Sequence, residues 1–265
     1  ASDYETMTIN SSGGANTITT LTAADLTSLT VTGSTALTIT NAIASATGLA
    51  TIDASTMTKA VSINASNSTG AVTFTGGSGG DTITSGAGND TLTGGSGNDT
   101  ITSGNGTNTI TGGAGDNTLT GGTGIDTITS GDGADTIDSG AGNDTITSGG
   151  GNDTLTFDTD ADLNANDTVD AGAGTDAAAI TIATALTTPF TLTNVENVDL
   201  TITGAITVDM SGVASIERLD IENGTSAGVA VSNLATGVTV RTFDANASLD
   251  VDTVAGATLT FDSQI

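Results

Sequence analysis

Residues 76–156 are nine consecutive nine-residue repeats, which read GGSGGDTIT, SGAGNDTLT, GGSGNDTIT, SGNGTNTIT, GGAGDNTLT, GGTGIDTIT, SGDGADTID, SGAGNDTIT and SGGGNDTLT. Positions 2 and 4 are Gly in every repeat, and position 8 is always Ile or Leu. Position 6 is Asp in seven repeats and Asn in two, at Asn108 and Asn117. A flexible linker has no reason to keep an aliphatic residue at every ninth position. The strict register therefore predicts a stack of similar structural units.

The last three residues of each repeat have the composition of a short β-strand. Thr, Ile and Leu suit strands, and neighbouring side chains along a strand point to opposite faces. The aliphatic residue at position 8 is therefore expected to face the core, and the residues on either side of it to face solvent. The predicted core residues are Ile83, Leu92, Ile101, Ile110, Leu119, Ile128, Ile137, Ile146 and Leu155.

These nonapeptides resemble the G-G-x-G-x-D-x-U-x repeats of RTX proteins, which are secreted bacterial proteins with calcium-binding repeats. The resemblance covers residues 76–156, and residues 167–176 (DTVDAGAGTD) look like a degenerate further copy. It implies a parallel β-roll in which positions 1–6 form a turn and positions 7–9 a strand. Successive repeats then lie on opposite sides, so that two repeats make one coil.

Electrostatics within such a roll predicts bound calcium. Neighbouring strands of a parallel ladder are about 4.8 Å apart, so bare carboxylates stacked at position 6 would repel each other. A divalent cation between successive turns would remove this repulsion. Ca²⁺ suits the turns better than Mg²⁺, because it accepts about six to eight oxygen ligands, backbone carbonyls included, in a flexible geometry. Several Ca²⁺ ions are therefore expected.

The expected calcium ligands are the position-6 side chains and the position-2 glycines, which tolerate positive φ and let carbonyls converge without a Cβ. One edge of the roll would carry Asp81, Asp99, Asn117, Asp135 and Asp153, and the other Asp90, Asn108, Asp126 and Asp144. The glycines are Gly77, Gly86, Gly95, Gly104, Gly113, Gly122, Gly131, Gly140 and Gly149. Because Asn keeps an oxygen but carries no charge, the Asn108 and Asn117 sites are expected to be weaker or altered.

The composition excludes several classes of site. The chain has 265 residues, with 3 basic against 30 acidic side chains, a net charge of −27, and neither Cys nor His. Without them it can form no disulfide, no Cys-ligated metal site and no Ser-His-Asp machinery. The few basic residues (Lys59, Arg218 and Arg241) cannot neutralise phosphates, so nucleic acids and anionic membranes are excluded as partners.

The chain shows no apolar run long enough for a transmembrane segment and no signal peptide. It opens with Ala1 rather than Met, so it is expected to be a mature form or a piece of a longer protein.

The flanking sequence also contains short strand-like segments, but it lacks the calcium-binding turns of the repeats. Predicted strands before the repeats are 29–32, 37–40, 50–53, 61–64 and 72–75, and after them 198–202, 206–210, 219–221, 238–240, 249–251 and 259–261. We therefore predict an all-β chain: a solenoid-like segment at 1–75, the calcium roll at 76–156, an acidic degenerate repeat at 157–179 and a second solenoid-like segment at 180–265. A sandwich is the alternative for the flanks, and any helix is expected near residues 21–29.

The composition of the chain resembles that of bacterial RTX-type S-layer proteins. Stretches such as 26–41 (LTSLTVTGSTALTITN) and 194–221 carry this resemblance. That resemblance implies type I secretion, calcium-driven folding and self-assembly into a two-dimensional lattice on the cell surface. A polysaccharide anchor would then lie outside this chain.

Three other functions remain open. Asp158, Asp160 and Asp162 have the residue type of glycosidase carboxylates, but an acidic calcium-binding loop explains them better, and no enzyme is predicted. The Thr-x-Thr strands would form regular hydroxyl arrays of the kind that an ice-binding or adhesin module uses. The roll would alternatively serve as a secretion and folding aid for cargo outside this chain.

Overall fold

The computed structural model describes residues 5–23, 25–43, 48–159, 161–183, 190–203, 206–213, 215–223, 229–242, 249–253 and 260–263. All regular structure in these residues is β-strand, and none of their segments is a helix that could cross a membrane. The chain divides into two compact units, residues 1–136 and 137–265. The division falls inside the repeats, within strand β14 (Thr136–Gly142).

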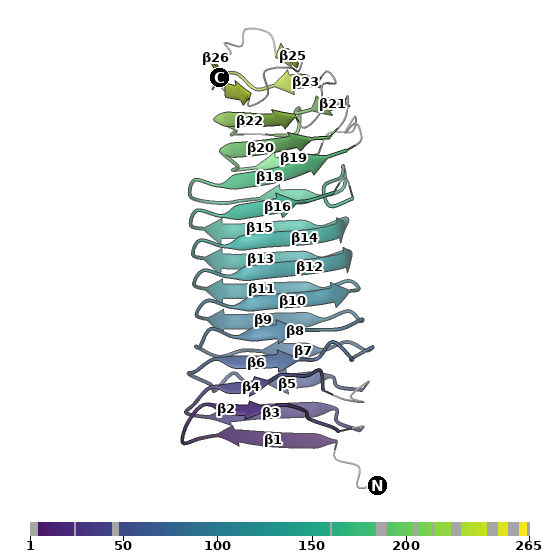
Figure 1. The fold of residues 1–265 in the computed structure, drawn as a ribbon, viewed down its shortest axis with the longest axis vertical. Coiled ribbons are helices and arrows are strands. Elements are labelled where there is room, and N and C mark those ends of the chain that lie inside the picture. The colour runs from purple at the N-terminus through teal and green to yellow at the C-terminus, as the bar shows by residue number, and fades with distance from the viewer. Residues whose placement is uncertain are drawn as a thin grey trace. The chain divides into compact units, whose positions relative to one another are not determined.

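The first unit is a parallel β-solenoid, in which consecutive strands alternate between two sheets (Figure 1). One sheet has the order β1-β3-β5-β7-β9-β11-β13 and the other β2-β4-β6-β8-β10-β12. The strands are β1 (Thr6–Ser11), β2 (Asn16–Ile18), β3 (Ser28–Gly33), β4 (Leu37–Ile39), β5 (Thr51–Asp53), β6 (Val61–Asn64), β7 (Thr73–Thr75), β8 (Thr82–Thr84), β9 (Thr91–Ser96), β10 (Thr100–Asn105), β11 (Thr109–Ala114), β12 (Thr118–Gly124) and β13 (Thr127–Asp132).

The second unit has the same parallel pairing. Its sheets have the orders β15-β17-β19, β16-β18-β20-β22-β24-β26 and β21-β23-β25. The strands are β15 (Thr145–Gly150), β16 (Thr154–Phe157), β17 (Thr168–Asp170), β18 (Ala177–Ile182), β19 (Thr191–Thr193), β20 (Asn197–Ile202), β21 (Ile206–Asp209), β22 (Arg218–Asn223), β23 (Val229–Leu234), β24 (Thr239–Thr242), β25 (Leu249–Thr253) and β26 (Thr260–Ser263).

The core of each coil is the aliphatic residue at position 8. In β10, Ile101 is 1% exposed, while Thr100 faces solvent and Thr102 is half-buried. All nine predicted core residues are at most 1% exposed. The alternation of a parallel strand therefore places them as the sequence predicted.

Coil length follows the spacing of the repeat. In the roll, Thr91 pairs with Thr109, so one coil takes 18 residues, as predicted. Before the roll, Ile52 pairs with Phe74, 22 residues apart, and the intervening Ile63 lies in the other sheet. The regular spacing of these three residues thus marks consecutive strands, which alternate between the two sheets. The parallel solenoid confirms the favoured fold over the sandwich.

Two expectations about local structure were wrong. The helix expected near residues 21–29 is not found among the described residues there, and Ser28 and Leu29 instead begin strand β3. The strands of the roll also extend beyond positions 7–9: β9 continues through Ser96, and Gly95 pairs with Gly113. The backbone ladder thus runs into the part of the repeat assigned to the turn, because glycine leaves room for neighbouring backbones to approach closely.

Candidate metal centre

The position-6 side chains lie inside the edges of the solenoid rather than on its surface. All nine predicted position-6 ligands are buried, each at most 2% exposed. Removing an ionised carboxylate from water is costly unless hydrogen bonds or a cation compensate for it. Each of these buried groups therefore needs partners that the fold supplies.

In the first unit, one oxygen of each stacked side chain caps the coil that precedes it. Asp99 Oδ1 accepts a hydrogen bond from the backbone N–H of Asp81 at 2.6 Å, and Asn117 Oδ1 accepts one from Asp99 N–H at 3.0 Å. On the opposite edge, Asn108 Oδ1 accepts from Asp90 N–H at 2.9 Å. The predicted stacking at intervals of 18 residues is thus present within the first unit. These bonds align the position-6 side chains and satisfy a backbone donor in each turn.

The second oxygen of Asp99 faces a space that only glycine leaves open. Asp99 Oδ2 is buried and accepts no hydrogen bond. A Cβ placed on Gly94 would lie 2.3 Å from this oxygen and 2.7 Å from the carbonyl oxygen of Gly112, in the next coil. Both oxygens thus lie beside Gly94, and the Asp99 oxygen has no donor there. This donor set fits Ca²⁺, which takes carboxylate and backbone carbonyl oxygens together.

The carboxylates of the first two repeats have more hydrogen-bond partners. Asp81 Oδ1 accepts from Val61 N–H at 2.8 Å, and its Oδ2 accepts from Gly77 N–H at 2.9 Å. Asp90 Oδ1 accepts from Val72 N–H at 2.7 Å, and its Oδ2 accepts from the Ser85 hydroxyl. Both residues thus cap the coils that precede the roll. A carboxylate has about four lone-pair positions, so these bonds leave room for a cation.

The position-2 glycines lie in the ladder between coils. Gly77 O accepts from Ser96 N–H at 2.9 Å, and Gly86 O accepts from Asn105 N–H at 3.2 Å. The carbonyl that turns toward the buried carboxylate of Asp99 comes instead from position 1, at Gly112. Sequence reasoning missed position 1, although its restriction to Gly or Ser in all nine repeats was visible. The ligand roles of the position-2 glycines remain predictions.

The degenerate repeat continues this arrangement in the second unit. Asp167 Oδ1 accepts from Asp144 N–H, and Asp176 Oδ1 from Asp153 N–H, each at 2.7 Å. Asp176 Oδ2 is buried and accepts no hydrogen bond, as at Asp99. The Asp176 N–H in turn donates to Glu196 Oε2 at 2.8 Å. Asp167 and Asp176 therefore join the candidate ligands, although the sequence analysis did not assign them that role.

Acidification is expected to restore structure to the calcium-free chain. Burial raises the pKa of Asp99 to about 6, and the negative charge of Asp81 adds to the rise. The folded state thus holds this proton more tightly than the unfolded chain, in which Asp titrates at about pH 3.9. The resulting stabilisation is complete below about pH 4 and is lost as the pH rises through about 6.

Far-UV circular dichroism of EDTA-treated protein should therefore gain β signal as the pH falls from about 7 to about 4. The Asp99→Asn variant, which cannot titrate there, should gain less. A β signal that decreases over this interval would contradict the assignment.

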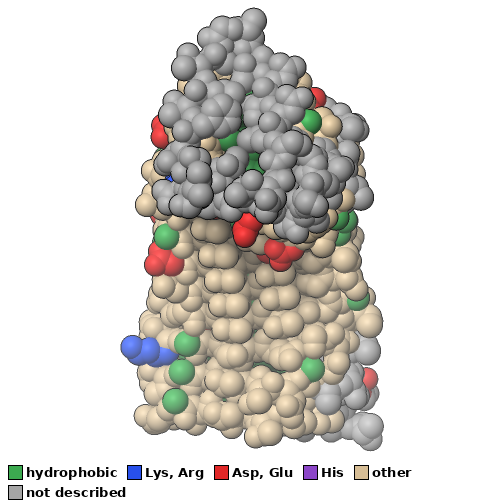
Figure 2. All heavy atoms as spheres, turned by 45° about the horizontal axis from the view of Figure 1, so that its top comes forward, with side chains coloured by type: hydrophobic (Ala, Val, Ile, Leu, Met, Phe, Trp, Pro, Cys, Tyr) green, Lys and Arg blue, Asp and Glu red, His purple; other side chains and the backbone are tan. Residues whose placement is uncertain are grey.

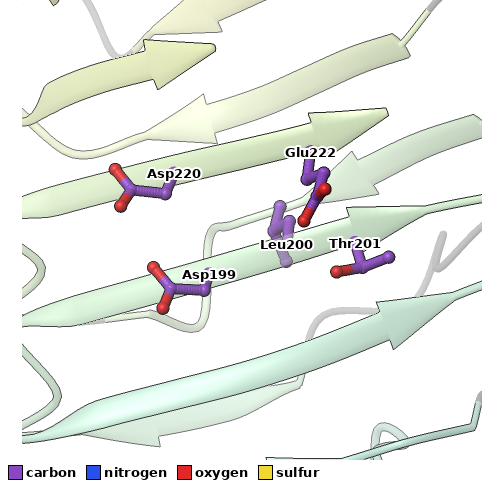
Figure 3. A pocket seen from close by; sticks show the side chains of 5 residues that line it. All are labelled: Asp199, Leu200, Thr201, Asp220 and Glu222. Atoms are coloured by element: carbon purple, nitrogen blue, oxygen red, sulfur yellow. The ribbon is translucent and has the colours of Figure 1, made fainter. Parts of the chain in front are cut away.

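A separate acidic pocket lies on the second unit, with a volume of about 330 Å³ (Figure 3). Asp199 and Asp220 are opposite each other on β20 and β22. Arg241 Nε donates to Asp220 Oδ1 at 2.6 Å, and Arg218 Nε to Asp220 Oδ2 at 3.1 Å. Burial raises the pKa of Asp220, but the Arg241 hydrogen bond and both guanidinium charges outweigh it and lower that pKa. The pocket is thus organised around an ion-pair network.

Side chains alone do not form a metal centre in the part of the chain that is described. No group of three or more acidic, His or Cys side chains there is arranged to hold an ion. A calcium site in the roll must therefore combine a carboxylate with backbone carbonyls, as at Asp99. Asp160, one of the three carboxylates considered for catalysis, lies outside the described residues.

Comparison with known proteins identifies the repeat segment. Residues 75–110, 111–146 and 129–163 match the family model of the RTX calcium-binding nonapeptide repeat, each match spanning four copies. No curated protein and no solved structure matches the chain. The match lies over the turns with buried position-6 side chains, so sequence family and site geometry agree on the same segment.

Proposed function

Because residues 75–163 are RTX repeats, which bind several Ca²⁺ ions, we propose that this chain is a calcium-folded structural protein of the S-layer type. RTX repeats indicate a secreted protein, and the proposed location is the outer surface of a bacterial cell. Calcium would complete the turns of the roll, and the folded roll would then associate with further copies in a two-dimensional lattice. In this proposal the chain has a structural role and no catalytic one.

Columns of threonine on the outside of the roll carry the proposal. In one sheet of the first unit, Thr82, Thr100 and Thr118 are in register on neighbouring strands. The other sheet has Thr91, Thr109 and Thr127 in the same relation. All six side chains are exposed. The two faces thus repeat one small polar group at the strand spacing of about 4.8 Å.

Such a face suits repeated contacts between identical subunits. Polar, uncharged side chains and backbone predominate over most of the described surface in view in Figure 2. The nine position-6 side chains are buried at the edges, so their charge does not line the six threonines of these columns. A second copy can therefore approach a column without strong repulsion, and a contact made at one coil recurs at the next. These features support lateral packing of rolls.

Lattice formation is expected to depend on the threonine columns. Calcium added to EDTA-treated protein should produce β signal and then ordered sheets visible by electron microscopy. The Thr100→Lys, Thr118→Lys variant should fold with the same calcium midpoint and lose the sheets, because two charges now stand on the packing face.

The matched control is Thr107→Lys, Thr123→Lys, which adds the same charges at exposed positions outside the columns and should still assemble. Sheets formed equally well by the column variant would contradict the proposed packing face. Folding without assembly in the unmodified protein would remove the lattice proposal and leave the calcium roll.

The same columns favour ice binding as the second candidate function. Regular hydroxyl and methyl groups on a flat sheet can order water at the strand spacing. Thermal hysteresis of the calcium-loaded protein measures this directly. Hysteresis that is lost in the column variant and kept in the matched control would establish ice binding, and its absence from the unmodified protein would end that alternative.

A further inference from the structure

Two consecutive repeats carry Asn instead of Asp at position 6. Asn108 and Asn117 lie nine residues apart, on opposite edges of the roll, so residues 103–120 form one coil without a position-6 carboxylate at either edge. The coils before and after it have Asp at both edges, at Asp90 and Asp99 and at Asp126 and Asp135. Asn at these two positions therefore leaves a single coil without either of the position-6 charges.

The amide of Asn117 occupies the place that the second carboxylate oxygen takes in the Asp99 turn. A Cβ placed on Gly94 would lie 2.3 Å from Asp99 Oδ2, and one placed on Gly112 would lie 2.8 Å from Asn117 Nδ2. The carbonyl oxygen of the next coil is 2.7 Å from each of these points, from Gly112 in the first case and Ser130 in the second. Beside the position-1 glycine, the Asp99 turn thus presents an acceptor and the Asn117 turn a donor.

That donor is already engaged. Asn117 Nδ2 donates to Gly115 O at 2.9 Å and makes a longer bond to Ser130 O at 3.5 Å. Its orientation is set by the other end of the amide, because Asn117 Oδ1 accepts from the N–H of Asp99. Rotating the amide to present oxygen to the turn would place two N–H donors together. An ion bound beside the Asn117 side chain in this turn would therefore face amide hydrogens rather than a second carboxylate oxygen.

The Asn108 turn is closed in a related way on the opposite edge. Asn108 Oδ1 is held by Asp90 N–H at 2.9 Å, and its Nδ2 donates to Gly106 O at 3.3 Å. The Ser103 hydroxyl at position 1 donates to Gly121 O, the position-1 carbonyl of the next coil, at 2.5 Å. Here a hydroxyl and an amide together satisfy the carbonyls of the turn. The turn has no position-6 carboxylate of its own, and the stacked carboxylate of the next coil already accepts from the Asn108 N–H, through Asp126 Oδ1 at 2.8 Å.

The neighbouring acid does not replace the missing charge. Asp116 precedes Asn117 and lies exposed on the surface, where its Oδ1 accepts from Ala134 N–H at 2.8 Å. Its side chain thus forms a hydrogen bond with a different turn, in the next coil.

We propose that the Asn108 and Asn117 turns bind no calcium and are closed by hydrogen bonds from their own amides, so that one metal-free coil divides the calcium sites of the roll into two groups. This inference revises the two Asn sites expected from the sequence. It rests on calcium binding by the RTX repeats and is independent of the lattice proposal.

Counting bound ions tests the inference. The full chain is saturated with Ca²⁺, freed of excess by gel filtration at low free calcium, and analysed by native mass spectrometry. The Asn108→Asp, Asn117→Asp variant should bind more ions than the unmodified protein, because each turn regains a carboxylate oxygen. The control Asn98→Asp, Asn105→Asp adds the same two charges at exposed positions of the roll and should leave the ion count unchanged.

The reciprocal variant keeps the test decisive if the first fails to fold. Asp99→Asn places an amide in a turn that fits calcium and should reduce the ion count. An unchanged count in Asp99→Asn would show that an amide is compatible with the ion and would overturn the inference. An unchanged count in a folded Asn108→Asp, Asn117→Asp protein would overturn it as well. Failure of lattice assembly affects neither count.

Discussion

Removing calcium with EDTA is expected to unfold residues 76–156, and millimolar calcium is expected to refold them cooperatively. Without an ion, the buried Asp99 carboxylate loses its compensation, and stacked repeats stabilise one another only when their neighbours are folded. Each ion bound only to the folded state adds about 2.7 kcal/mol at a concentration 100-fold above its Kd. Far-UV circular dichroism during a calcium titration measures the transition, with magnesium as the control ion.

The same titration separates ligands from other acids. Asp99→Ala removes a buried carboxylate oxygen and should raise the calcium midpoint. Asp116→Ala removes an exposed one and should shift it far less. Full β signal in EDTA would contradict calcium-dependent folding, and an unchanged midpoint in Asp99→Ala would contradict its assignment as a ligand.

Replacing Gly113 by Val is expected to destabilise the calcium-loaded protein by about 4 kcal/mol or more. Gly113 has φ of +110°, and a Cβ there would lie 1.9 Å from the carbonyl oxygen of Gly95 in the preceding coil. The side chain would therefore force two backbones apart in the middle of the stack, in a backbone conformation that Val does not tolerate. Urea unfolding at saturating calcium measures the loss.

Gly14→Val provides the matched control, because a Cβ on Gly14 would have no atom within 4 Å and the residue has no positive φ. The unfolding free energy of this variant should stay within about 0.5 kcal/mol of that of the unmodified protein. Equal stability of the two variants would show that close approach of the coils at position 2 is not a requirement of the fold.

The repeat made much of the fold predictable from sequence. Ile101 and Ile110 were assigned to the core because alternation along a strand and the nine-residue period both point to the same position. The flanking strands were also found, since Ile52, Ile63 and Phe74 keep a regular spacing across the two sheets. In each case a local pattern carries the information.

Contacts between coils were harder to predict. The sequence indicated that Asp99 would be stacked, but not that it would be buried, with one oxygen on the N–H of Asp81 and the other beside the carbonyl of Gly112. These partners lie 18 and 13 residues away in the chain, and their orientation depends on how two coils are aligned. The helix expected near residues 21–29 failed for a similar reason, because pairing of Leu29 with Met7 places the end of that segment in strand β3.

The alternation of strands between two sheets limits how the roll can change in length during evolution. Deleting two repeats removes one coil, and every later strand keeps its sheet, its neighbours and its inward residues. Deleting one repeat moves each later strand to the opposite sheet and brings different flanking sequences together. Copy number should therefore vary among descendants of this gene in pairs, in steps of about 4.8 Å along the stack.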